Sequence, residues 1–185
     1  DRRAVAAGGT RAELTDAVAR AATRRVAYFA TSNEFNDWNT VHHTFVYANA
    51  AHELTDRTNA TELYRTCFDG AISVYLDRFL NSPRAPVPEP GDSSRDPETV
   101  REELLASFDE QGAVDRAGRL VSEHFDVGGE PGRLKRVLGR GLLREAADFH
   151  TNQNVGATIR RFDPPEGSEE RRVALTSRAP DPAAP

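Results

Sequence analysis

The chain is poor in the residues that most often mark a cofactor site or a membrane segment. Its one cysteine, Cys67, can form no internal disulfide and cannot build a Cys-rich zinc ribbon or a Cys-ligated iron–sulfur cluster. A lone cysteine favours a reducing compartment, so we expect a cytoplasmic protein. No segment approaches the ~20 consecutive apolar residues that cross a bilayer, so we expect no membrane partner.

Lysine is almost absent as well. Lys135 is the only lysine, the other cations are arginines, and the formal net charge is −5. The sequence contains no basic stripe with interleaved aromatic residues. The sequence therefore predicts no nucleic-acid partner.

Strand-like alternation is missing, whereas apolar residues recur at helical spacing through most of the 185 residues. This pattern predicts an all-α bundle of five or six helices, with a Pro-rich loop in the middle of the chain. We expect a single helical domain over residues 10–162. Residues 163–185 form a polar, Pro/Ala-rich segment whose composition predicts a disordered tail.

Helix ends are predicted from capping patterns and from proline. The first expected helix begins at Thr10. The others are expected to span about 38–55, 59–81, 96–112, 114–125 and 133–162. The capping signals are Thr10 with Glu13, Asn59 with Glu62, either Asp37 or Asn39, and Asp96 before Pro97. The helix over 59–81 carries an apolar stripe that is expected to face the core. Its members are Leu63, Tyr64, Cys67, Phe68, Ala71, Ile72, Tyr75 and Phe79.

The segment "DWNTVHHTFVYANAAHEL", residues 37–54, is unusually polar on its apolar side. A step of ~100° per residue places an apolar direction through Val41, Phe45 and Ala48. Four polar residues fall inside that stripe or at its edge: His42, Asn49, His52 and Glu53. The polar face is expected to consist of Thr40, Thr44, Ala51 and Thr55.

The last expected helix also has polar residues on its apolar side, in the segment "LLREAADFHTNQN". Its inward or edge positions include Glu145, His150, Asn152 and Gln153. An unsatisfied buried polar group costs about 1–3 kcal/mol, so two such helices are expected to pack with their polar residues together. Arg25, inside the stripe of the first helix, is a candidate partner for one of the glutamates.

The leading hypothesis for this polar set is a divalent metal site, with iron as the candidate ion, in a redox-related protein. Histidine and carboxylate side chains in a bundle core are common metal ligands, and the candidate ligands are His52, Glu53, Glu145 and His150. His42 and His52 are ten residues apart, about 15 Å along a helix, so they cannot share one ion. The paired Glu-x-x-His pattern of ferritin-type di-iron centres is absent.

Three alternatives stay open. The polar side chains could orient a small molecule, with a histidine as general acid or base. They could instead form a hydrogen-bond network that binds nothing. In a protein-interaction module, an exposed apolar patch of several hundred Å² is expected. The candidate ligand-binding residues are His42, Asn49, Tyr75, Asn152 and Gln153.

The two polar segments, with "AISVYLDRFLNSP" between them, resemble a group of bacterial and archaeal helical proteins. The resemblance covers about residues 20–162. Some members of this group lie beside, or are fused to, a Rieske-type iron–sulfur domain. The Rieske ligand pattern is absent from this chain, so the resemblance implies a redox context and a redox protein partner rather than a cluster of its own.

Overall fold

The computed structural model describes residues 8–80, 84–86, 89, 94–144 and 149–161. All regular structure within these residues is helical, which confirms the all-α class. The chain divides into two compact units, residues 1–85 and 86–185, and each is described here by itself. A single domain over 10–162 therefore stays a prediction, and the expected tail at 163–185 lies outside the described residues.

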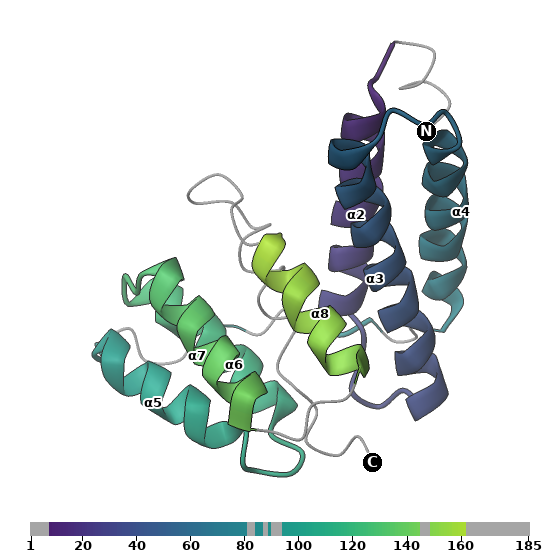
Figure 1. Cartoon of the computed structure of the whole chain (residues 1–185). Helices are drawn as coiled ribbons and strands as arrows, with labels where there is room; N and C mark the ends of the chain where they lie inside the picture. The colour runs from purple at the N-terminus through teal and green to yellow at the C-terminus, as the bar shows by residue number, and fades with distance from the viewer. Residues whose placement is uncertain (1–7, 81–83, 87–88, 90–93, 145–148, 162–185) are drawn as a thin grey trace. The chain divides into compact units, whose positions relative to one another are not determined.

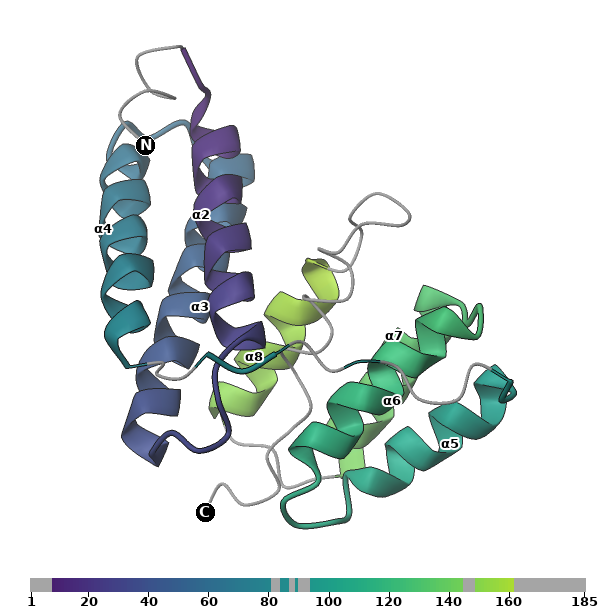
Figure 2. The ribbon, with the colours of Figure 1, turned by 180° about the vertical axis from the view of Figure 1, so that it is seen from behind.

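The first unit is built from three long helices, which Figures 1 and 2 show side by side, and a short 3-10 helix that follows the third of them. They are α2 (Arg11–Ala27), α3 (Phe35–Arg57), α4 (Leu63–Leu76) and η1 (Asp77–Phe79). Each of the three α-helices packs against the other two. Their shared core includes Ala19, Ala22, Val26, Phe29, Val41, Phe45, Ala48 and Leu63.

The start of α2 follows the sequence pattern. The Thr10 hydroxyl accepts a hydrogen bond from the Glu13 backbone N–H at 3.2 Å, and the Glu13 carboxylate accepts from the Thr10 N–H at 2.8 Å. This capping box confirms the predicted helix start. The start of α3 was predicted wrongly, because the helix begins at Phe35 after Glu34 rather than at Asp37 or Asn39.

The predicted capping box before α4 is also wrong. The side-chain oxygen of Asn59 accepts a hydrogen bond from Arg11 Nη2 at 3.1 Å, and the other Nη of Arg11 donates to the Ala60 carbonyl, also at 3.1 Å. Asn59 therefore ties the α3–α4 connection to α2. The residue preceding α4 is Glu62, and its side chain makes no capping hydrogen bond.

Gly70 allows α4 to approach its two neighbours closely. A Cβ atom at this position would lie 2.9 Å from Val18 Cγ1 of α2 and 3.6 Å from Tyr47 Cε1 of α3. The missing side chain thus fixes which face of α4 is buried. Cys67 and Leu63 lie on the same face as Gly70 and are buried with it.

The second unit contains α5 (Pro97–Ser107), α6 (Val114–Asp126), α7 (Pro131–Arg144) and α8 (Phe149–Arg160). Asp96 caps α5 through hydrogen bonds from the N–H groups of Glu98 and Thr99, as its position before Pro97 predicts. A continuous helix over 133–162 is not what the structure describes, since α7 ends at Arg144 and α8 begins at Phe149. Residues 145–148 lie outside the described residues. The core is Val100, Leu104, Phe108, Ala117, Leu120, Val121, Leu134, Val137 and Leu138.

The two adjacent glycines of "DVGGEPG", Gly128 and Gly129, belong to the turn between α6 and α7. Gly128 has a φ of +77°, a conformation that glycine adopts at low cost. The Gly129 N–H donates to the His124 carbonyl at 2.7 Å, and the buried His124 ring donates from Nε2 to the Glu130 carbonyl at 3.2 Å. A Cβ on Gly129 would lie 2.1 Å from His124 Cε1, so this turn and the histidine fit together only with glycine.

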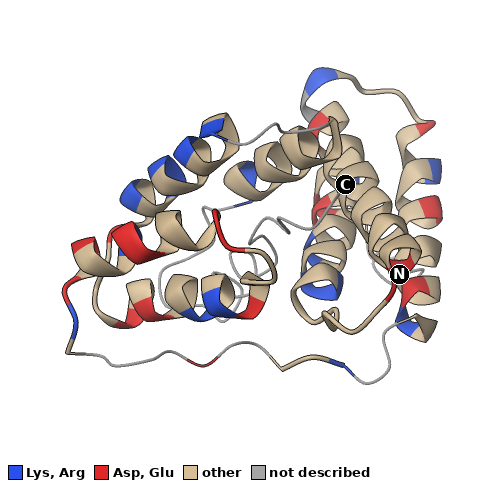
Figure 3. Cartoon of the chain, turned by 90° about the horizontal axis from the view of Figure 1, so that it is seen from below, with Lys and Arg blue, Asp and Glu red and all other residues tan. Residues whose placement is uncertain are grey.

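Charged residues of both signs are distributed over the helices, as Figure 3 shows. Two helices lack acidic residues: α7, which carries five cations, and α8, which carries one arginine. Within the described part of the chain, no helix combines the length and the apolar character needed to cross a membrane.

Candidate functional site

The polar residues predicted on α3 have mixed surroundings. Asn49 is buried, and its Nδ2 donates to the Phe45 carbonyl at 2.8 Å. His42 and Glu53 are half-buried. Thr44 and Ala51, predicted on the polar face, are buried instead. This correction has a physical reason, since α3 packs against both α2 and α4 and therefore buries more than one stripe.

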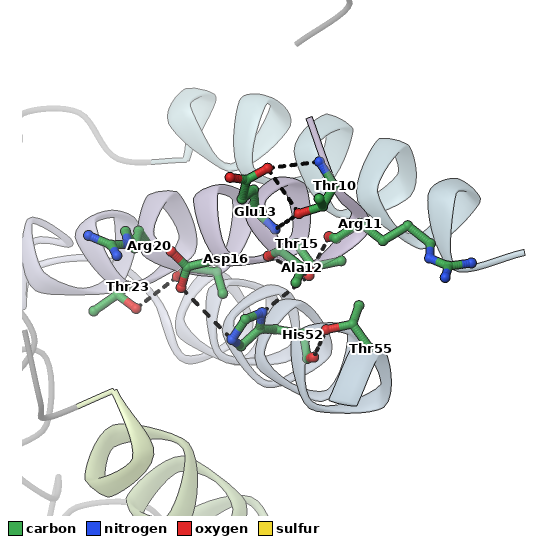
Figure 4. A network of polar contacts seen from close by, with 11 residues as sticks. Thr10, Arg11, Ala12, Glu13, Thr15, Asp16, Arg20, Thr23, His52 and Thr55 are labelled. Atoms are coloured by element: carbon green, nitrogen blue, oxygen red, sulfur yellow. Dashed lines mark hydrogen bonds and ion pairs between the residues drawn. The ribbon is translucent and has the colours of Figure 1, made fainter. Parts of the chain in front are cut away.

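His52 faces α2, as Figure 4 shows. Its Nδ1 lies 3.2 Å from the Thr15 hydroxyl oxygen, and its Nε2 lies 3.9 Å from Asp16 Oδ1. The other Asp16 oxygen accepts a hydrogen bond of 2.7 Å from Arg20 Nε. These contacts link α3 to one turn of α2.

The hydrogen-bond donors at this contact can be assigned. The Thr15 hydroxyl lies 2.9 Å from the Arg11 carbonyl and 3.1 Å from the Ala12 carbonyl, and it has one hydrogen to donate. With that hydrogen on a carbonyl of its own helix, the Thr15 oxygen accepts from His52 Nδ1–H, while Nε2 faces Asp16. Thr15 is fully buried, so its hydroxyl is not placed to attack a substrate. The arrangement is that of a structural link.

A second polar link in the first unit involves Arg25 and Asp77. Arg25 was predicted to pair with a glutamate, but its Nη2 donates to the Val74 carbonyl at the end of α4, at 3.2 Å. Asp77 is buried; burial raises the pKa of its carboxyl, while a hydrogen bond from Thr44 and the charge of Arg25 oppose that rise. Asp77 was not among the predicted site residues, although its spacing of seven residues from Gly70 places it on the side of the buried face of α4.

The residues predicted on the last helix have different outcomes. Glu145 lies outside the described residues. His150 is half-buried, with its ring centroid 5.6 Å from that of Phe149, and Gln153 is also half-buried. Asn152 is exposed, so its inward placement was wrong.

The buried polar residues of α8 are Asn154 and Thr158, which were not predicted. Their spacing of four residues places them on one helical face. The predicted phase assumed one helix from residue 133 onward. Because α8 is a separate helix, its phase is set by its own packing.

Among the described residues, no three or more histidine, cysteine, aspartate or glutamate side chains converge in a way that could hold a metal ion. The predicted ligands belong to both units and include Glu145, outside the described residues. The metal site, and the meeting of the two polar helices, therefore stay predictions.

An apolar stripe on the outer side of α4 is the most distinctive surface of the first unit. Its four residues, here named the α4 stripe, are Phe68, Ile72 and Tyr75 on α4 and Phe79 at the end of the adjoining η1. Their exposed fractions are 45%, 57%, 52% and 64%. Leu76, beside them, is 53% exposed. The sequence pattern predicted that these four residues face the core, and the inward placement of Tyr75 in particular was wrong.

The reason for this error is that α4 is apolar on two faces. Leu63, Cys67 and Gly70 form the face that packs against α2 and α3. At ~100° per residue, Phe68, Ile72 and Tyr75 lie on nearly the opposite side of α4. A single stripe through all the apolar residues merged two surfaces, of which only one is buried within the described structure.

The C-terminal end of the α4 stripe is ordered by ring contacts. The Tyr75 and Phe79 ring centroids are 5.9 Å apart in an edge-to-face arrangement. Arg78 Cζ lies 3.9 Å from the Tyr75 centroid and 4.5 Å from the Phe79 centroid, and its Nη2 donates to the Tyr75 hydroxyl at 2.8 Å. These contacts hold the two rings in place without covering them fully.

Comparisons of the chain with protein-family models, with characterised proteins and with solved structures found no match. The resemblance to helical proteins with Rieske-type neighbours stays a prediction. The surfaces and contacts of the described residues therefore carry the functional inference.

Proposed function

We propose that the first unit is a protein-interaction module that binds a helix along the α4 stripe. The observation that carries this proposal is the exposure of Phe68, Ile72, Tyr75 and Phe79 on a helix whose opposite face is buried. The intervals of four and three residues between Phe68, Ile72 and Tyr75 are the spacing at which one α-helix packs along another, and Phe79 extends this surface into η1.

The size of the surface supports the same proposal. An aromatic side chain presents about 150–250 Å², so five large side chains that are about half exposed leave roughly 500 Å² of mainly apolar surface. A patch of this size matches the largest apolar patch on a typical monomeric protein, which is often a binding surface. Leu76 and the four residues of the α4 stripe together form this patch.

The polar contacts then have a supporting role. The link between His52 and Thr15 joins α3 to α2, and the interactions of Arg25 join α2 to the end of α4. Both fix the helices that present the α4 stripe. With one buried cysteine, we place the module in the cytoplasm.

A library of displayed amphipathic helices tests the proposal on the full chain. Helices selected on the wild-type protein should bind it with micromolar or better affinity by fluorescence anisotropy. The variant Ile72→Glu should bind them at least about a hundredfold more weakly, because a charge then lies at the centre of the apolar contact.

Phe35→Glu is the matched control, since Phe35 is a 61% exposed aromatic residue of the same unit, at the start of α3. It should leave the affinity within about twofold of the wild type. Equal weakening by both variants, or a failure to select any helix whose binding depends on Ile72, would refute the proposed function. Far-ultraviolet circular dichroism confirms that each variant keeps its helices.

A further inference from the structure

We propose that the helix bound by the α4 stripe is α4 of a second copy of this chain, in antiparallel orientation. This inference rests on the proposed function and names its partner. The intervals between Phe68, Ile72, Tyr75 and Phe79 read the same in both directions along the helix. A two-fold axis level with the midpoint between residues 73 and 74 therefore makes the stripe complementary to itself.

The antiparallel pairing has well-matched layers. Phe68 of one copy meets Phe79 of the second, and Ile72 meets Tyr75. Each Ile72 is thus set against a larger ring, so side chains of different size alternate across the contact, which favours close packing. The rings of Tyr75 and Phe79 are already ordered by Arg78, so the contact requires little further ordering of side chains.

The area agrees with a reversible dimer. Two copies of a patch of roughly 500 Å² bury about 1,000 Å², the lower bound for a specific protein–protein contact. An arginine at the border of an aromatic cluster is also typical of such contacts. We expect an equilibrium between monomer and dimer that depends on concentration.

Sedimentation equilibrium of the full chain tests the second copy as occupant. The wild type should show a monomer–dimer equilibrium, and Ile72→Glu should raise its dissociation constant at least about a hundredfold. Phe35→Glu should leave the constant within about twofold. A wild type that stays monomeric up to high micromolar concentration overturns the inference, as does a dimer that Ile72→Glu leaves intact.

Cross-linking tests the orientation. Phe68→Cys and Phe79→Cys are each made in a Cys67→Ala chain, and one of them carries a mass tag. A short bis-maleimide reagent should link the two different variants to each other when they are mixed. Cross-links that form mainly within each variant alone would overturn the antiparallel pairing.

The two proposals fail in different ways. If the wild type is monomeric yet binds displayed helices through Ile72, the second copy is not the occupant and the helix-binding function stands. If neither dimer nor bound helix depends on Ile72, both are wrong.

Discussion

His52 Nδ1 lies 3.2 Å from the Thr15 hydroxyl oxygen and thereby joins α3 to α2 inside the first unit. A histidine in the middle of a polar helix was expected to bind a metal ion or a ligand. In the structure one ring nitrogen is engaged by a buried threonine and the other faces Asp16. The contact predicts a measurable coupling between the two helices.

A double-mutant cycle of Thr15→Val and His52→Ala should give a coupling free energy of about 0.5–1.5 kcal/mol, the net contribution of one hydrogen bond. Urea unfolding followed by circular dichroism measures it. Thr23→Val is the control for Thr15, because the Thr23 hydroxyl donates to the Ala19 carbonyl on α2. A cycle between Thr23 and His52 should show no coupling, and a coupling of equal size in both cycles would contradict the assignment.

Elemental analysis distinguishes a metal-binding role of His52 from this structural role. If His52 is a ligand, protein purified without a His tag should hold near-stoichiometric metal, and His52→Ala should lose it. If His52 acts only through Thr15 and Asp16, the variant loses stability while the metal content of the wild type and of the variant is the same.

Asp77 predicts a pH dependence of stability. Burial raises the pKa of this carboxyl, so the folded chain holds its proton to a higher pH than the unfolded chain. The wild type should therefore lose stability relative to Asp77→Asn as the pH rises above about 4, the ordinary aspartate pKa, and the difference should level off above the raised value.

Urea unfolding of both proteins over a pH series measures this difference. Asp69→Asn, on the exposed side of α4, is the control; its ion pair with Arg65 is exposed and contributes little. If the wild type instead gains stability relative to Asp77→Asn over the same rise in pH, the expectation is contradicted.

The turn after α6 predicts a strong preference for glycine at position 129. Gly129→Ala should cost about 1–3 kcal/mol, because its Cβ would lie 2.1 Å from His124 Cε1 and 2.4 Å from the His124 carbonyl oxygen. Gly132→Ala, in the first turn of α7 with no atom within 4 Å of its Cβ, should be neutral or stabilising by up to about 1 kcal/mol. Thermal unfolding of the two variants compares them; equal effects would show that the turn tolerates a side chain.

Local signals in the sequence predicted the local structure well. The Thr10 capping box and the Asp96 cap lie where the pattern placed them, because each depends only on residues within one turn. The cap predicted at Asn59 was wrong, because Arg11, which is distant in sequence, donates a hydrogen bond to its side-chain oxygen. Whether a cap forms can therefore depend on a partner that no local pattern contains.

Helical phase predicted burial only where a helix has one packed face. On α3, packing against two neighbours buries Thr44 in addition to the expected stripe. On α4, the apolar residues form two faces, so periodicity alone could not assign Phe68 and Ile72 to the surface. On α8, the phase could not be carried over from α7, and Asn154 is buried in place of Asn152.

Hydroxyl-radical footprinting of the wild-type chain tests most directly whether the α4 stripe is a binding surface. Phe68, Tyr75 and Phe79 should be modified rapidly in the dilute chain and become protected severalfold when a selected helix or a second copy is bound. Phe35, exposed in the same unit, should be modified at the same rate in both states. Unchanged modification of the three stripe residues on binding, or equal protection of Phe35, would contradict the proposed docking surface.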